Sequence, residues 1–319
     1  MKITVIGCGR WGSFIAYYLD MIGHDVTVYG LKDAPEMQRF LKERRNDLLE
    51  FPESIALTTD KNDIPNAETV VISIGAQGFR GLLDELNELQ IKNKNFVLCM
   101  KGIEIATGER LSEIAEEKLD PSNRIAVWLG PGHVQEFYRG VPNCMVIDSK
   151  DEALKTALVD SFSSNLIRFY YGDDLIGSEI GGAAKNVLGI AAGMLDGLSM
   201  TSLKGALMSR GTREIARLIR DMGGDERSAS GLCLLGDYEA TLFSKHSHNR
   251  AFGEMFVKGE QFPSLAEGYY TVKALMTLKK KYGTDLPIST AVYNILYEAA
   301  DPKEELLKLF SRSLKKELE

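Results

Sequence analysis

Short apolar runs alternate with amphipathic stretches through the first half of this chain. The apolar runs are rich in β-branched residues and predict strands, whereas the stretches between them repeat apolar residues at helical spacing. Strands are expected at residues 2–6, 25–30, 68–75, 95–100 and 124–130, and helices at 11–21, 35–49, 79–90 and 108–118. Two more apolar runs, 144–148 and 167–171, predict strands at the far edge of the sheet. This alternation indicates a mostly parallel sheet with helices on both faces.

The pattern changes near Leu175, after which only helical segments are expected. These segments span residues 175–198, 203–223, 227–235, 250–257, 267–282, 288–298 and 302–317. The chain therefore predicts an α/β protein with two domains. Residues 1–174 would form a Rossmann-type, doubly wound, mostly parallel sheet, and residues 175–319 would form an all-helical domain.

Composition narrows the classes of function. The 319 residues are 44% hydrophobic and 26% charged, which is ordinary for a globular protein and excludes a disordered chain. The net charge of −7 argues against a nucleic-acid partner, because such proteins present a basic face. No apolar run approaches the roughly 20 residues of a membrane span, and the first residues predict a strand rather than a signal peptide. The four widely spaced cysteines are expected to be reduced, so we expect a cytoplasmic protein without membrane insertion.

A glycine cluster links the first strand to the first helix. Gly7, Gly9 and Gly12 fit the pattern GxGxxG, and their place between a strand and a helix is typical of dinucleotide-binding folds. Gly7 would allow the tight turn, Gly9 the approach of a pyrophosphate, and Gly12 close packing of helix on strand. The alternative is a glycine-rich turn without a ligand.

The end of the second strand bears on the choice of cofactor. An acidic residue at the strand tip would bind the ribose 2′-hydroxyl of NAD, but the tip here is Tyr29-Gly30-Leu31. Lys32 could meet the 2′-phosphate of NADP, whereas Asp33 keeps NAD open. The sequence therefore favours NADP(H) over NAD. The alternative for Lys32 is a solvated loop lysine.

One helix in the second half carries a lysine among small residues. One face of the segment 178–198 would bear Gly181, Gly182, Lys185, Gly189, Ala192, Gly193 and Asp196. Glycine disfavours a helix by roughly 1 kcal/mol relative to alanine, so several glycines around one lysine predict space held open for a ligand. The alternative is a buried core helix whose lysine extends its ammonium to solvent or pairs with Asp196.

Other polar clusters follow later strands and helices. Lys101 follows the fourth strand, at the edge where parallel sheets bind ligands, and the glycine-containing loop 130–136 follows the fifth. Asp237 precedes the polar run 244–250, which is rich in hydrogen-bond donors and suits an anion. His246 and His248 could bind a metal, but no third ligand has helpful spacing, so no metal is expected.

In this order, these motifs resemble the bacterial NAD(P)-dependent glycerol-3-phosphate dehydrogenases over most of the chain, from Met1 to about Asn294. The lysine-helix string is the most specific of them. The resemblance rests on GCGRWG (7–12), GHDVTVYG (23–30), KGIE (101–104), GPGHVQE (130–136), GSEIGGAAKNVLGIAAGMLDG (177–197), SRGTREI (209–215), LLGDY (234–238), SHNRAFG (247–253), AEG (266–268) and LPI (286–288).

The resemblance implies a role for each matching position. Lys185 would be the proton donor and acceptor at the C2 oxygen, and Lys101 would contact both substrate and cofactor. The other substrate-binding positions would be Gly130, Gly132, Asp237, Ser247, His248 and Asn249. The glycine loop and Lys32 are already assigned to the cofactor, and the resemblance adds further positions. Together the cofactor-binding positions would be Gly7, Gly9, Arg10, Trp11, Gly12, Leu31, Lys32, Lys101, Val134, His248, Leu265 and Glu267. The reaction would be reversible hydride transfer between NAD(P)(H) and glycerol 3-phosphate, a small phosphorylated substrate of glycerophospholipid biosynthesis.

Several positions depart from the family pattern. The usual Ser-Arg-Asn is Ser-His-Asn at 247–249, and the usual Ser or Thr of the GP loop is Gly132. The stretch 199–207 lacks the usual Asn, and the loop around 46–58 is shortened. A related dehydrogenase of another small hydroxy acid or phosphorylated alcohol therefore stays an alternative. So does a non-catalytic dinucleotide-sensing protein, although the presence of both lysines argues against it. A homodimer is left open.

Overall fold

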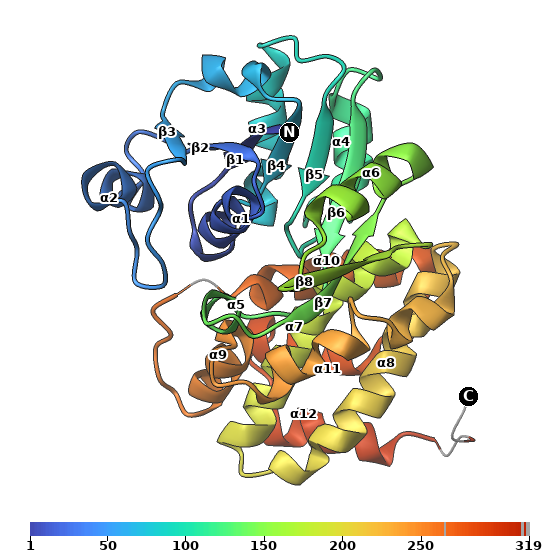
Figure 1. The fold of residues 1–319 in the computed structure, drawn as a ribbon. Coiled ribbons are helices and arrows are strands. Elements are labelled where there is room, and N and C mark those ends of the chain that lie inside the picture. Colours follow the sequence, from blue (N-terminus) through green and yellow to red (C-terminus); the bar gives the residue numbers. More distant parts are fainter. Residues whose placement is uncertain (265, 314–315, 317–319) are drawn as a thin grey trace. The chain divides into compact units, whose positions relative to one another are not determined.

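The chain folds into two compact units in the computed structural model, which describes residues 1–264, 266–313 and 316 (Figure 1). The first unit comprises Met1–Glu104 and Glu109–Glu179, and the second comprises Ile105–Gly108 and Ile180–Glu319. The sequence placed the division at residue 174, whereas the contacts within the structure place it inside a helix, between Glu179 and Ile180.

An eight-stranded sheet forms the centre of the first unit. Its order is β3-β2-β1-β4-β5-β6-β7-β8, and β7 runs antiparallel to β6 while every other neighbouring pair is parallel. The strands are β1 (Lys2–Ile6), β2 (Asp25–Tyr29), β3 (Ala56–Thr58), β4 (Thr69–Ile72), β5 (Asn95–Leu98), β6 (Arg124–Leu129), β7 (Asn143–Asp148) and β8 (Ile167–Tyr171). The order reverses at β1, where β2 and β4 lie on either side, which confirms the doubly wound arrangement.

Helices cover both faces of this sheet. The helices of the first unit are α1 (Arg10–Met21), α2 (Pro35–Glu43), α3 (Phe79–Asn87), α4 (Leu111–Lys118), α5 (Val134–Tyr138) and α6 (Glu152–Phe162). Val97 and Trp128 point from β5 and β6 into one core cluster with Phe14 of α1 and Phe162 of α6. Successive residues of a strand face opposite sides of the sheet. The buried residues of β5 and β6 that alternate with Val97 and Trp128 therefore face α3 and α4, behind the sheet in Figure 1.

Three local predictions for the first unit were wrong. The helix expected at 35–49 ends at Glu43, because Arg44 adopts a left-handed conformation with φ 54° and its carbonyl accepts a hydrogen bond from the N–H of Phe51. The short strand β3 was not predicted, since it has three residues and only partly buried side chains. Helices α5 and α6 were also missed.

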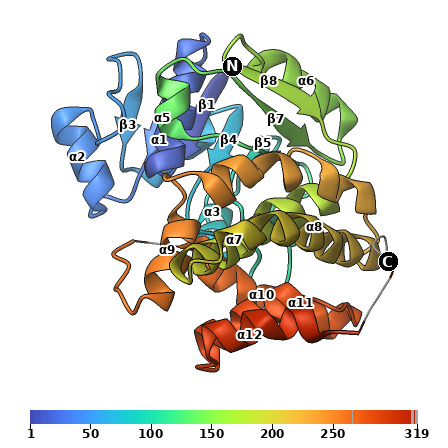
Figure 2. The same ribbon diagram turned by 90° about the horizontal axis from the view of Figure 1, so that it is seen from below.

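The second unit is built from helices, as the sequence predicts. Its helices are α7 (Leu175–Gly197), α8 (Lys204–Asp221), α9 (His248–Val257), α10 (Glu267–Tyr282), α11 (Pro287–Tyr297) and α12 (Pro302–Lys308). Helix α7 begins in the first unit and is buried along nearly its whole length in the second. Figure 2 shows α11 and α12 side by side. Among the described residues, no helix is long and apolar enough to cross a lipid bilayer.

Two helical predictions need correction here. The helix expected at 227–235 is replaced by two short 3₁₀ turns, Glu226–Ser230 and Leu235–Asp237. The helix expected at 302–317 ends at Lys308 and is followed by a 3₁₀ turn, Leu309–Ser311. Residues 314–315 and 317 of that prediction lie outside the described residues.

Candidate functional site

The glycine loop joins β1 to α1 in the first unit, at the point where the strand order reverses. Gly7 has φ 101°, and its N–H donates to the carbonyl of Tyr29 at 2.9 Å. A Cβ at Gly7 would lie 2.3 Å from the Ser73 carbonyl oxygen, and one at Gly12 would lie 2.1 Å from the Gly7 oxygen. Around Gly9, by contrast, a Cβ would meet nothing within 4 Å. Two glycines are thus required by packing, and the third leaves open space above the loop.

The first turn of α1 follows directly and completes this site. Gly9 is the N-cap and contributes no side-chain hydrogen bond. Trp11 packs its ring against Phe14 and Phe137, and its buried Nε1 has no hydrogen-bond partner among the described residues. A helix N-terminus with a bare glycine cap presents backbone N–H groups and the positive end of the helix dipole. The loop therefore fits the pyrophosphate of a dinucleotide.

The residues that follow β2 are exposed. The side chain of Leu31 is 63% exposed, and Lys32 and Asp33 are also at the surface. The backbone carbonyl of Lys32 accepts a hydrogen bond from the Gln38 side chain, which holds the loop while leaving the ammonium in solvent. Both the lysine and the carboxylate are therefore open to solvent at the tip of β2.

The ends of β5 and β6 bring Lys101 against Gly130. The Lys101 Nζ donates to the Gly130 carbonyl at 2.5 Å, as expected for residues that follow neighbouring parallel strands. Gly132 has φ 150°, and a Cβ there would lie 2.1 Å from the Phe137 ring. The Ser or Thr that the resemblance noted above leads one to expect here would therefore clash in this chain. Val134 is the first residue of α5, and it is buried in the core of the first unit.

Lys185 lies at the centre of a polar cluster in the second unit. Its Nζ is 2.6 Å from Oδ2 of Asp237 and donates to Oγ1 of Thr241 at 2.9 Å. The Thr241 hydroxyl in turn lies 3.4 Å from the other Asp237 oxygen. The side chains of Lys185 and Asp237 are only 9% and 1% exposed. A buried ion pair of this kind holds the lysine amine in one place.

Backbone geometry brings this cluster together. Asp237 ends a 3₁₀ turn and Thr241 lies in a short π-helix, Glu239–Phe243, so both side chains face α7. π-Helical turns are rare and are frequent at functional sites. The sequence identified Lys185 and Asp237 but missed Thr241, because only the tertiary fold places its hydroxyl beside the lysine.

The glycine stripe of α7 does not hold a space open, which corrects the sequence prediction. A Cβ at Gly189 would lie 2.8 Å from Thr241, and one at Gly193 would lie 1.9 Å from the Arg250 carbonyl oxygen. The glycines therefore allow the π-helix and α9 to pack directly on α7. The alternative pairing of Lys185 with Asp196 is also wrong, because Asp196 pairs with Lys204 and Arg250.

The start of α9 forms a second polar cluster in the same unit. The Ser247 hydroxyl caps the helix by accepting from the N–H of Arg250. His248 is the first helical residue and stacks edge-on against Phe262 at 5.9 Å between ring centroids. Asn249 donates to the Asn186 side chain at 3.0 Å. Asn186 follows Lys185 directly, so α9 is tied to the helix that carries the lysine.

Helix α10 begins beside the same asparagine. Asn249 accepts from the N–H of Gly268 at 2.9 Å, and Glu267 is the first residue of α10. This contact positions Glu267 near the start of α9. Leu265, the other cofactor position implied here, lies outside the described residues. Among the described residues, no group of three or more His, Cys, Asp or Glu side chains could hold a metal.

Comparison with known proteins shows where this combination of sites occurs. Residues 2–155 match the family described as NAD-dependent glycerol-3-phosphate dehydrogenase N-terminus, and residues 174–307 match the corresponding C-terminus. Two relatives named glycerol-3-phosphate dehydrogenase [NAD(P)+] come from Thermoanaerobacter sp. and Exiguobacterium sp. They are 34% and 35% identical to this chain. Each alignment covers 100% of this chain, and it covers 99% and 97% of the two relatives, respectively.

A solved structure gives the same result. The glycerol-3-phosphate dehydrogenase of Coxiella burnetii is 26% identical and superposes with a TM-score of 0.92. The match covers 97% of this chain and 98% of that one. The similarity therefore extends through both units.

Proposed function

This chain belongs to the family of NAD-dependent glycerol-3-phosphate dehydrogenases, and we propose that Lys185 is the proton donor and acceptor of its reaction. The protein is an NAD(P)-dependent oxidoreductase that interconverts glycerol 3-phosphate and dihydroxyacetone phosphate. When bound, the nicotinamide dinucleotide supplies the hydride acceptor or donor for C2. The observation that carries the proposal is the buried lysine held by Asp237 and Thr241.

Lys185 handles the proton that accompanies the hydride. In the reduction of the ketone, C2 gains a hydride and its oxygen takes a proton from the Lys185 ammonium, which becomes a neutral amine. In the oxidation of the alcohol the amine takes the hydroxyl proton back. Asp237 and Thr241 orient Nζ through their contacts of 2.6 Å and 2.9 Å, which fixes the position from which the ammonium would meet the substrate oxygen.

Backbone groups and side chains at the start of α9 would bind the substrate phosphate. Ser247, His248 and Asn249 occupy the cap and first positions of this helix, where the helix dipole favours an anion. The contact between Asn249 and Asn186 supports this assignment, because it links the proposed phosphate site to the residue beside Lys185. Helix α7 would then set the distance between the phosphate site and Lys185.

The first unit would bind the cofactor. The turn at Gly7 and Gly9 and the first turn of α1 would receive the pyrophosphate, with Arg10 and Trp11 at its edge. Lys101, whose ammonium donates a hydrogen bond to Gly130, would contact both cofactor and substrate. Val134 would meet the cofactor, and Gly130 and Gly132 would line the substrate. Leu31 and Lys32 would face the adenosine ribose. Cytoplasmic location stays a prediction.

The proposal is tested by activity and by two substitutions of the same lysine. The purified protein should oxidise NADPH or NADH with dihydroxyacetone phosphate and leave a panel of 2-keto and 3-keto acids unreduced. Lys185→Ala should lower kcat by roughly 10²–10⁴, the usual contribution of a general acid or base. Lys185→Arg should be about as inactive, since arginine keeps the positive charge but does not release its proton.

Cofactor affinity serves as the control for both variants. It should match that of the unsubstituted protein, because the glycine loop that would receive the pyrophosphate lies in the first unit and Lys185 is not among the cofactor-binding positions. Near-normal turnover of Lys185→Ala would leave the lysine a structural role only. Cofactor binding without reduction of any carbonyl compound by the unsubstituted protein would instead indicate a dinucleotide sensor.

A further inference from the structure

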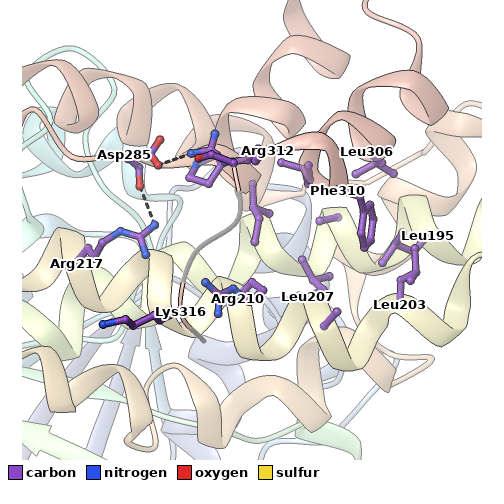
Figure 3. A pocket seen from close by; sticks show the side chains of 16 residues that line it. Leu195, Leu203, Leu207, Arg210, Arg217, Asp285, Leu306, Phe310, Arg312 and Lys316 are labelled. Carbon is purple, nitrogen blue, oxygen red and sulfur yellow. Dashed lines mark hydrogen bonds and ion pairs between the residues drawn. The ribbon is translucent and has the colours of Figure 1, made fainter. Parts of the chain in front are cut away.

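A pocket of about 340 Å³ lies within the second unit, away from the lysine cluster. Its described lining comes from α7 and α8, from Asp285 and the start of α11, and from residues 306, 309–310, 312–313 and 316 (Figure 3). Its volume lies within the range of about 300–1,000 Å³ that is common for small-molecule sites. Neither Lys185 nor Asp237 nor Thr241 lines it.

The pocket is chemically divided along its length. One end is apolar, with side chains including Leu195, Leu203, Leu207, Leu306 and Phe310 (Figure 3). The other end is basic, and its charged side chains are Arg210, Arg217, Arg312, Lys316 and Asp285. Among the described lining residues this end carries four cations and one carboxylate. Arg210 and Lys316 have further partners, so Arg217 and Arg312 are the cations that mark this end as a local site for an anion in a chain of net charge −7.

The single carboxylate is already engaged at this end of the pocket. Asp285 accepts from the Arg312 guanidinium at 2.6 Å, and its backbone carbonyl accepts from Arg217 at 3.0 Å. Asp285 therefore holds both arginines in position: its carboxylate pairs with Arg312, and its backbone carbonyl binds Arg217 without offsetting the charge of that guanidinium. Arginine is suited to bidentate binding of carboxylate and phosphate groups, so a held pair of guanidinium groups favours these anions.

We propose that this pocket binds an amphipathic anion, a single acyl or alkyl chain that ends in a carboxylate or a phosphate. The chain would lie along the leucines and Phe310, and the anionic group would contact Arg217 and Arg312. The apolar walls remove the chain from water, and the basic end selects the anion. A neutral chain of the same length would leave the basic end without a partner.

The pocket shares α7 with the proposed catalytic site but uses another side of it. Ala191 and Leu195 of α7 line the pocket, and both lie on the turns after Lys185. At about 100° per residue, Ala191 is about 120° around the helix from the lysine. An occupied pocket therefore contacts the helix of the catalytic lysine without touching its ion pair.

Calorimetric titration of the full chain with decanoate, decyl phosphate and decanol tests the proposal. All three probes are used below the concentration at which they form micelles. Both anions should bind saturably, with decanol at least tenfold weaker. Octanoate should bind more weakly than decanoate by roughly fifteenfold, since it lacks two methylenes and each contributes about fourfold in affinity. Absence of saturable binding by both anions would overturn the proposal, and equal binding of decanol would overturn its anionic half.

Substitutions locate the binding in this pocket. Arg217→Gln and Arg312→Gln should weaken both anions about tenfold and leave decanol unchanged. Ala206→Trp should abolish binding of all probes, because Ala206 is an exposed small residue of the lining that a large side chain can extend from into the pocket. Arg220→Gln, on the same helix but outside the lining, is the matched control.

The variants also separate loss of the site from loss of the fold. Each must keep the melting temperature of the unsubstituted protein before its affinity is compared. Phe310 is 61% exposed, so Phe310→Ala removes part of the apolar wall without opening the core and should weaken decanoate and decanol alike. Anion binding that survives Ala206→Trp and both arginine substitutions would place the ligand elsewhere and overturn the assignment.

Discussion

A single hydroxyl connects the charged residues of the lysine cluster. Thr241 accepts from Lys185 at 2.9 Å and lies 3.4 Å from Asp237, so it limits the directions in which Nζ can point. Thr241→Val should therefore lower kcat by roughly tenfold to a hundredfold, the scale of a hydrogen bond to a charged group. KM should change little, because the substitution leaves the proposed phosphate site intact. Steady-state kinetics at several pH values measures both constants.

A second threonine provides the control for this prediction. Thr212 donates to the Met208 carbonyl and lies 3.1 Å from the Tyr238 hydroxyl, away from the lysine. Thr212→Val should leave kcat within about twofold of the original value, since no charged partner is lost. Equal effects of the two substitutions would mean that Thr241 supports the fold rather than the lysine.

His248 stands at the start of α9 where the sequence resemblance implies an arginine, and this difference should appear in the pH dependence. Histidine has a reference pKa near 6.5, so its charge depends on pH near neutrality, whereas arginine stays charged. KM for dihydroxyacetone phosphate should fall between about pH 8 and 6, and it should fall less in His248→Arg. The second ionisation of the phosphate itself, near 6, affects both proteins equally, so the difference between them is the measurement.

The neighbouring His246 serves as the control for this pH effect. His246 is exposed and precedes the Ser247 cap, so His246→Arg should keep the pH profile of the unsubstituted protein. Identical profiles for the unsubstituted protein and His248→Arg would mean that His248 does not face the phosphate. The charge would then come from Lys245 or Arg250.

At the scale of single elements, the glycines of α7 determine how closely α9 can pack. A Cβ at Gly193 would lie 1.9 Å from the Arg250 carbonyl oxygen, which is backbone and cannot move aside alone. Gly193→Ala should therefore lower the free energy of unfolding by about 1–3 kcal/mol, despite the better helix propensity of alanine. Denaturant unfolding of the purified protein measures this change.

Gly205 in α8 is the matched helical control. A Cβ there would meet nothing within 4 Å, so Gly205→Ala should leave the free energy of unfolding unchanged or raise it by up to about 1 kcal/mol. Stabilisation by both substitutions would show that α7 and α9 are not in close contact at Gly193.

The elements that the sequence predicted well are those with an uninterrupted pattern. The buried strands β1, β4, β5 and β6 are runs of β-branched and apolar residues, and α7, α8, α10 and α11 repeat apolar residues at helical spacing. The strand β3 was missed because three residues carry no period, and the stop at Arg44 depends on a hydrogen bond from Phe51. Local pattern contains neither signal.

At the scale of the whole molecule, motifs identified the two candidate sites, and tertiary contacts added residues that the motifs lacked. The glycine loop and the Lys185 helix are contiguous strings, so both could be found without a structure. The role of the glycine stripe could not be found in this way. Close packing of another helix and an open space for a ligand both require glycine, so the sequence does not distinguish them. The contacts of Thr241 and Asn249 with α7 join segments more than fifty residues apart, as the hydrogen bonds from Lys185 and to Asn186 show.

Cofactor preference is the property of the whole molecule that the sequence and structure address together. The strand tip after β2 has no acid, Lys32 is exposed beside it, and Asp33 follows. The protein should therefore bind NADPH at least as tightly as NADH, as measured by fluorescence titration. Lys32→Gln should weaken NADPH roughly twofold to tenfold and leave NADH unchanged, because an exposed lysine contributes at most about 1 kcal/mol to an ion pair. Raising the salt concentration should reduce this difference.

Asp33→Asn is the converse control and should weaken only NADH if its carboxylate binds the ribose. A preference for NADH of more than about tenfold, roughly 1.4 kcal/mol, would contradict the prediction and identify Asp33 as the residue that selects the cofactor.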